Sequence, residues 1–139
     1  QTILNKRENY RKAFDNFDAT KISRYNQSKV QNLLKDEGIV RNRLKIGATI
    51  INASQFLKVK KEFGSFDRYI WQFVNHKPIR NRFKSLSDIP ANTKDAEAMS
   101  KDLLKSGFKF VGPTICYAFM QAVGMVNDHM VNCFKNAKD

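Results

Sequence analysis

The amino-acid sequence predicts an all-α fold built as one domain. Apolar residues recur three and four positions apart along most of the chain, the spacing that places them on one side of a helix. Capping residues precede these segments and glycines follow them, whereas no segment shows the sustained period-two alternation of a half-buried strand. The length of 139 residues suits a single hydrophobic core, so we expect one helical domain over residues 1–139.

The first half of the chain contains four predicted helices. They cover residues 2–17, a segment from Ser28 to Gly38, residues 42–62 and residues 66–74. The candidate N-caps are Asp18, Ser28 and Ser65, and the candidate C-terminal glycines are Gly38 and Gly64. The helix over 66–74 is too densely apolar to lie on the surface, so we expect it to be buried.

The second half of the chain is predicted to contain two helices joined by a short turn. Its elements in order are a loop over 79–92, a helix capped by Asn92 or Thr93, a turn over 107–112, a helix over 114–123 closed by Gly124, and a short helix beginning near Asn127 or Asp128. Gly107 and Gly112 bracket the turn, and Pro113 stands in the first turn of the helix that follows. This is the most specific local pattern in the sequence.

The charge and composition restrict the class of protein. Twenty-five Lys and Arg against thirteen Asp and Glu give a net charge of +12, and 42% hydrophobic residues exclude disorder. The chain has no apolar run of the roughly 18 residues that a membrane span needs, no signal-peptide layout and only two cysteines, so we expect a cytoplasmic protein without membrane contact. The basic excess favours a polyanionic partner, although each basic cluster is also compatible with a solvated helix face.

The turn over 107–112 is the first candidate site. A glycine-bracketed turn that leads into a helix N-terminus presents backbone N–H groups that can hold a DNA phosphate without reading the base. Lys109 at its tip adds a point charge. A tight corner between two helices that binds no ligand explains the glycines equally well.

The second candidate site is the pair His129 and Cys133, which lie four residues apart on one side of a helix and could both bind zinc. A structural zinc needs four ligands, so an unliganded pair remains the alternative, and we expect Cys116 to belong to the core. The sequence shows no Ser/His/Asp set, no glycine-rich nucleotide loop and no carboxylate pair. Asp128 is the one acid in a suggestive setting, with helix capping as its alternative role.

Several segments together resemble bacterial DNA-3-methyladenine glycosylase type I, and the resemblance runs from end to end. They are Lys6-Arg7-Glu8-Asn9-Tyr10-Arg11, residues 38–46, Phe73-Val74-Asn75-His76, the turn Gly107-Phe108-Lys109-Phe110-Val111-Gly112 with Thr114-Ile115-Cys116-Tyr117, and Val126-Asn127-Asp128-His129. The resemblance implies a helix-hairpin-helix DNA glycosylase fold, with the motif at about 93–124. It implies that this hairpin and Thr114 grip the DNA backbone.

The resemblance also implies a structural zinc bound by His129 and Cys133, whose two further ligands, a Cys and a His, come from an N-terminal segment that precedes Gln1. We expect the catalytic and base-recognition residues in that same segment. The implied substrate is double-stranded alkylated DNA, and the implied protein is a monomer.

The implied reaction is hydrolysis of the N-glycosidic bond of 3-methyladenine after the base is flipped from the duplex. Methylation at N3 makes the base a cationic leaving group, so a strong general acid is dispensable. Relatives in the wider superfamily carry a catalytic Asp where this chain has Asn127, and bifunctional relatives carry a Schiff-base lysine where it has Thr114. We therefore expect no strand cleavage. The alternatives are a non-enzymatic helix-hairpin-helix DNA-binding module and a basic helical protein that binds acidic surfaces.

Overall fold

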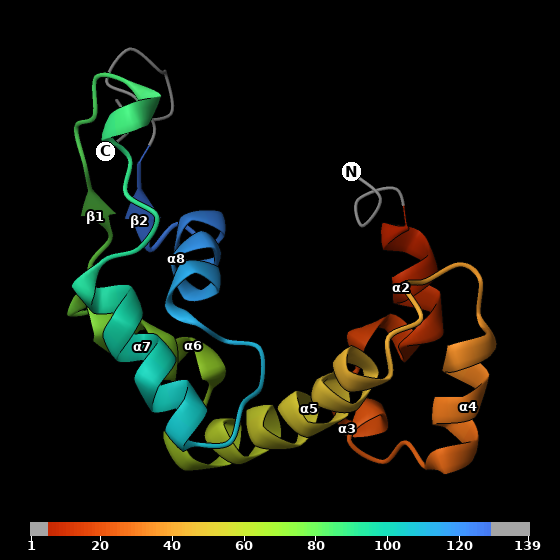
Figure 1. Cartoon of the computed structure of the whole chain (residues 1–139). Coiled ribbons are helices and arrows are strands. Elements are labelled where there is room, and N and C mark those ends of the chain that lie inside the picture. Colours follow the sequence, from red (N-terminus) through yellow and green to blue (C-terminus); the bar gives the residue numbers. More distant parts are fainter. Residues whose placement is uncertain (1–5, 129–139) are drawn as a thin grey trace. The chain divides into compact units, whose positions relative to one another are not determined.

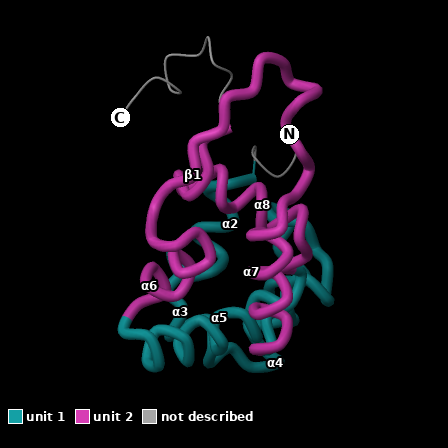
Figure 2. Tube along the Cα trace, turned by 90° about the vertical axis from the view of Figure 1, so that its left-hand side faces the viewer, with its two compact units in different colours: residues 1–64, 107–110 teal, residues 65–106, 111–139 magenta. Residues whose placement is uncertain are grey.

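The computed structural model describes residues 6–128, and its backbone divides into two compact units (Figure 2). Unit 1 comprises the described residues through Gly64 together with Gly107–Phe110. Unit 2 comprises Ser65–Ser106 and the described residues from Val111 onward. The fold is mostly helical in both units, as the sequence predicts, whereas the expectation of one domain stays a prediction.

Unit 1 is built from short N-terminal helices and one long helix (Figure 1). In chain order these are α2 (Arg7–Ala13), the 3₁₀ turn η1 (Asp15–Phe17), α3 (Ala19–Ile22), α4 (Gln27–Lys35) and α5 (Arg43–Phe63). The predicted helix over 2–17 is therefore too long. Three consecutive residues from Asp15 to Phe17 have φ between 52° and 59°, which breaks the right-handed helix.

The caps in unit 1 confirm two sequence predictions and correct two. Gly38 does not end the predicted helix, because α4 ends at Lys35 and the backbone of its C-cap, Asp36, is extended. Asp18 accepts hydrogen bonds from the backbone N–H groups of Thr20 and Lys21, and Gly64 ends α5 with φ of 87°. The prediction that Ser28 caps the next helix is wrong. Asn26 takes this role, because its backbone is extended and its Oδ1 accepts the Lys29 N–H at 2.9 Å.

The core of unit 1 is formed by apolar side chains of α3, α4 and α5 and of the segments that flank these helices. Its buried members are Phe14, Ile22, Leu33, Ile39, Ile46 and Ala53. Polar groups at its edge are paired: the Tyr10 hydroxyl accepts the Val40 N–H at 2.9 Å, and the Tyr25 hydroxyl donates to Asp15 at 2.6 Å. Burial and this hydrogen bond raise the pKa of Tyr25 above its usual value.

Unit 2 contains the remaining helices and a minimal sheet (Figure 1). Its elements are α6 (Phe66–Trp71), η2 (Gln72–Val74), β1 (Ile79–Arg80), η3 (Leu86–Asp88), α7 (Lys94–Lys105), α8 (Pro113–Ala122) and β2 (Val126–Asn127). Ser65 and Thr93 cap α6 and α7 as predicted.

The two strands of unit 2 pair in parallel, with Ile79 opposite Val126 and Arg80 opposite Asn127. The sequence predicted a loop at the first segment and a helix beginning near Asn127 at the second, and both details are wrong for these residues. Two-residue strands are too short to show the alternation on which strand prediction depends. Residues 129–133 of the predicted last helix lie outside the described residues.

Helices α7 and α8 pack against each other and supply much of the core of unit 2. Its largest fully buried side chains are Tyr69, Met99, Ser100, Tyr117, Met120 and Met125. The Tyr69 hydroxyl donates a short hydrogen bond to Asp102, and burial together with this bond raises the pKa of Tyr69. Over residues 6–128, no helix combines the length and the apolar character that crossing a bilayer requires.

Candidate nucleic-acid interface

Of the two glycines that bracket the hairpin over 107–112, only Gly107 has a backbone conformation that favours glycine. Gly107 has φ of 105°, which residues with a β-carbon rarely adopt, and it follows directly on the last turn of α7. Gly112 has an ordinary φ of −63° and stands at the N-cap of α8. Between them Phe110 has φ of 58°, a left-handed conformation in a bulky residue. The described structure therefore shows strain at the tip of the hairpin.

In unit 1, the tip of the hairpin is bound by a side chain of α5. Asn52 Oδ1 accepts the backbone N–H of Lys109 at 2.7 Å, and Asn52 Nδ2 donates to the backbone carbonyl of Lys109 at 3.0 Å. Phe108 is 6% exposed, whereas Lys109 and Phe110 face solvent. The Lys109 N–H is therefore not available to a phosphate, and this residue offers its exposed ammonium instead.

In unit 2, the segment that enters α8 is held by two buried donors. Ser100 Oγ donates to the Val111 carbonyl at 2.6 Å, and Cys116 Sγ donates to the same oxygen at 3.3 Å. Burial raises the pKa of the Cys116 thiol, partly offset by a hydrogen bond with Ser100, so the thiol keeps its proton and remains a donor. The C=O and the following N–H of a trans peptide point in opposite directions. Drawing the Val111 carbonyl inward thus turns the Gly112 N–H away from Ser100 and Cys116.

The N-terminus of α8 presents unused donors. Within residues 6–128, the backbone N–H groups of Gly112, Thr114 and Ile115 form no hydrogen bond. The first N–H groups of a helix have no partner in the helix itself, and they carry its positive dipole end. Gly112 also leaves space, since a β-carbon placed there would meet no atom within 4 Å. The arrangement suits a phosphate oxygen.

Asp128 has a structural environment. Its carboxylate accepts hydrogen bonds from the side chains of Tyr117, Asn81 and Gln121, and the residue is 7% exposed. Burial and the bond to Asp128 raise the pKa of Tyr117. The carboxylate thus joins α8 to the segment after β1 in unit 2, where three side-chain donors occupy it.

The predicted zinc ligands His129 and Cys133 lie outside the described residues, so the metal site stays a prediction. Cys116 is 2% exposed and belongs to the core, as the sequence indicated. The second histidine, His76, lines a shallow hollow with Trp71 and Pro78. Across residues 6–128, no group of three His, Cys, Asp or Glu side chains is placed to share a metal ion.

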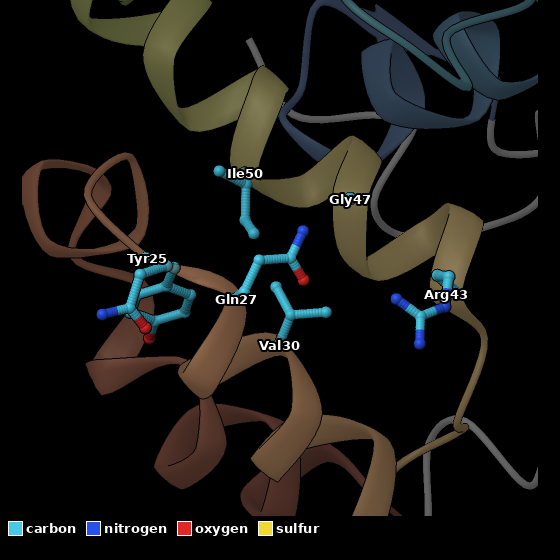
Figure 3. A pocket seen from close by; sticks show the side chains of 7 residues that line it. Tyr25, Gln27, Val30, Arg43, Gly47 and Ile50 are labelled. Carbon is cyan, nitrogen blue, oxygen red and sulfur yellow. The ribbon is translucent and has the colours of Figure 1, made fainter.

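A cavity of about 520 Å³ opens between α4 and α5 in unit 1 (Figure 3). Val30 of α4 and Ile50 of α5 extend toward one another across it, with Arg43 at its side. Its lining contains this one cation and neither a carboxylate nor a histidine. The cavity therefore lacks the paired groups of general acid–base catalysis.

Helices α7 and α8 pack together and are joined by a short hairpin, so this strongly basic chain is a helix-hairpin-helix protein. Its fold matches that of solved DNA glycosylases. A family model described as methyladenine glycosylase matches residues 1–136. DNA-3-methyladenine glycosylase 1 of Escherichia coli (strain K12) is 48% identical over 132 residues, which cover 95% of this chain and 71% of the relative. The chain belongs to the methyladenine glycosylase family.

Solved structures of relatives agree with this assignment. A crystal structure of 3-methyladenine DNA glycosylase I matches with a TM-score of 0.91 and 47% identity, covering 96% of this chain and 73% of that one. A variant of 3-methyladenine DNA glycosylase I in complex with 3-methyladenine matches with a TM-score of 0.94 and 34% identity, covering 99% and 74%.

The sequence indicates the hairpin but not the side chains that hold it in place. Ser100 gave a signal, because it stands at a position of α7 that shares the buried stripe of Ala96, Met99 and Leu103, where a polar residue needs a partner. Asn52 gave none, since 57 positions separate it from Lys109 and neither residue is part of a local motif.

Proposed function

We propose that this protein hydrolyses the N-glycosidic bond of 3-methyladenine in alkylated double-stranded DNA, acting as a monomer and leaving the strand intact. The observation that carries the proposal is the 48% identity to the Escherichia coli glycosylase over nearly the whole chain. The non-enzymatic DNA-binding module is the weaker candidate, because it leaves the likeness to an enzyme complex with the base unexplained.

The backbone contacts follow from the donors described above. In unit 2, the N–H groups of Gly112, Thr114 and Ile115 would bind one phosphate at the N-terminus of α8. In unit 1, the Lys109 ammonium would add charge without fixing sequence. These contacts position the duplex, while base recognition belongs to residues that we expect before Gln1.

Hydrolysis of this N-glycosidic bond does not require a strong general acid or base. A base methylated at N3 carries a positive charge and leaves readily, so the protein's tasks are to hold the flipped base and to shield the developing oxocarbenium ion. The environment of Asp128 suits this mechanism, because its carboxylate is already occupied by three donors. Thr114 carries no amine, so a Schiff base with the sugar cannot form at this position and strand cleavage is not expected.

A structural zinc is part of the proposal. Imidazole and thiolate are ordinary zinc ligands, and His129 and Cys133 have the four-residue spacing that one face of a helix provides. As the resemblance implies, the other two ligands would come from residues before Gln1. Metal analysis of the full-length protein should give about one zinc per chain, and His129→Ala and Cys133→Ala should each lose it. Unchanged zinc content in both variants would contradict the ligand assignment.

The decisive experiment measures free 3-methyladenine released from methylated duplex DNA by the full-length, metal-loaded protein. Release from methylated but not from unmethylated duplex, with the strand intact until alkali is added, is the expected result. Strand breaks without alkali would contradict the monofunctional reaction. Equal binding of both duplexes without any release would favour the non-enzymatic module.

A further inference from the structure

Two hydrogen bonds join Asn52 of α5 to the backbone of Lys109 in the hairpin, and we call this pair of bonds the clasp. Asn52 uses both ends of its amide on one residue, Lys109, which lies 57 positions away in the chain. We propose that Asn52 is a positioning residue for DNA binding by the hairpin, and that the clasp fixes the direction of the Phe110 N–H. The inference rests on the proposed function, since it concerns how the same hairpin meets the duplex.

Peptide geometry connects Asn52 to the Phe110 N–H. The Lys109 carbonyl and the Phe110 N–H belong to one trans peptide and point in opposite directions. Because Asn52 Nδ2 binds that carbonyl at 3.0 Å, the N–H is turned away from α5. Within the described residues the Phe110 N–H donates to no group. The Phe110 N–H is therefore available as a donor, and Asn52 determines the direction in which it points.

The backbone of Phe110 needs such support. Its φ of 58° is unfavourable for a residue with a β-carbon, and the residue is 55% exposed, so its own side chain is not buried enough to hold it there. Strained conformations persist where the surroundings fix them, and they gather at functional sites. The clasp on the preceding residue supplies this constraint.

A second polar side chain of α5 lies under the same segment. Gln55, one turn after Asn52, is so close to Gly107 that a β-carbon on this glycine would meet its side chain at 3.3 Å. Phe108, between the two supported residues, supplies the apolar packing. Apolar packing alone would hold the segment in place. The bidentate amide adds a fixed orientation of one peptide, which is what a hydrogen bond to a phosphate requires.

Two substitutions separate the hydrogen bonds of the clasp. Asn52→Ala removes both, while Asn52→Asp keeps the acceptor for the Lys109 N–H and places a second acceptor against its carbonyl. Asn32→Asp is the matched control, because it makes the same charge change at an exposed position of α4. All three are measured as full-length protein for thermal unfolding, for the Kd of undamaged duplex, and for kcat and KM of base release.

Both Asn52 variants should raise Kd and KM together by about tenfold while kcat changes less than about twofold, because the lost interaction is made equally in the ground and transition states. Asn32→Asp should stay close to wild type. Kd and KM of the Asn52 variants equal to those of Asn32→Asp would overturn the inference, as would a loss confined to kcat. If one variant unfolds, the other decides. If the wild type releases no base, the proposed function fails, yet the Kd comparison still tests Asn52.

Discussion

Substituting Gly112 by alanine separates folding from DNA binding at the start of α8. Gly112 has φ of −63°, which alanine adopts freely, and a β-carbon would meet nothing within 4 Å. Alanine is a poorer N-cap than glycine by up to about 1 kcal/mol, but it also lowers the entropy of the unfolded chain by about 0.4–1 kcal/mol. The two effects nearly cancel, so the unfolding free energy should change by less than about 0.5 kcal/mol.

DNA binding should respond very differently to the same methyl group. The methyl group would occupy space beside the Gly112 N–H, where we expect a phosphate oxygen. A charge-assisted hydrogen bond contributes about 1.5–3 kcal/mol, so its loss should raise the Kd for duplex DNA about ten- to hundredfold. Fluorescence anisotropy with a labelled undamaged duplex measures this Kd, and thermal denaturation measures stability.

Gly47→Ala provides the control for Gly112→Ala. Gly47 lies inside α5, and a β-carbon there also meets nothing within 4 Å. Helix propensity should raise stability by about 0.8–1 kcal/mol without changing Kd. Equally tight duplex binding by Gly112→Ala and Gly47→Ala would refute a phosphate at the N-terminus of α8, because the added methyl group would clash with it.

Three further outcomes follow from the described geometry. Gly107→Ala should lose about 1–2 kcal/mol in denaturant unfolding, given its φ of 105° and the nearby Gln55; a neutral result would contradict the strain. Cys116 should resist iodoacetamide until the protein unfolds, because burial raises its pKa; labelling of its peptide in native protein, seen by mass spectrometry, would disagree. Burial raises the pKa of Tyr69, so the contribution of its neutral hydroxyl to the free energy of unfolding is complete below about pH 10 and is lost as the pH rises above it. The free energy of unfolding of Tyr69→Phe should therefore decline less steeply at alkaline pH than that of the wild type, and an equal slope would contradict this.

The sequence was most informative where structure is local. Helix α5 is predicted almost to its ends, because its apolar residues are periodic and Gly64 is a strong C-terminal glycine; Asn42, the first residue of the predicted helix, is its N-cap in the structure. Asn26 and Ser28 are both good caps, and the choice between them depends on which backbone is extended, which composition does not reveal. Errors of this kind move a boundary by two residues and leave the fold unchanged.

In the candidate site, too, only the features formed by neighbouring residues could be predicted from the sequence. The hairpin was recognisable because its glycines and Pro113 are adjacent in the chain. The partners of its peptides were not, since Asn52 and Ser100 contact it only after the helices have packed. For Asp128 the sequence offered an acid or a cap, whereas two of its donors, Tyr117 and Gln121, lie on α8 and the third, Asn81, follows β1. Long-range hydrogen bonds leave no spacing that can be read from the sequence.

The separation between Asn52 and Lys109 bears on the order of events during synthesis. The buried core cluster of unit 1 ends at Ala53, so it can gather once this part of the chain has left the ribosome. The amide of Asn52 cannot bind Lys109 until the whole of α7 has been synthesised, because Lys109 follows this helix in the chain. A nascent chain that ends before Lys109 could contain the folded core of unit 1 but not the hairpin that packs on it. DNA binding by the hairpin would then arise in one late step of synthesis.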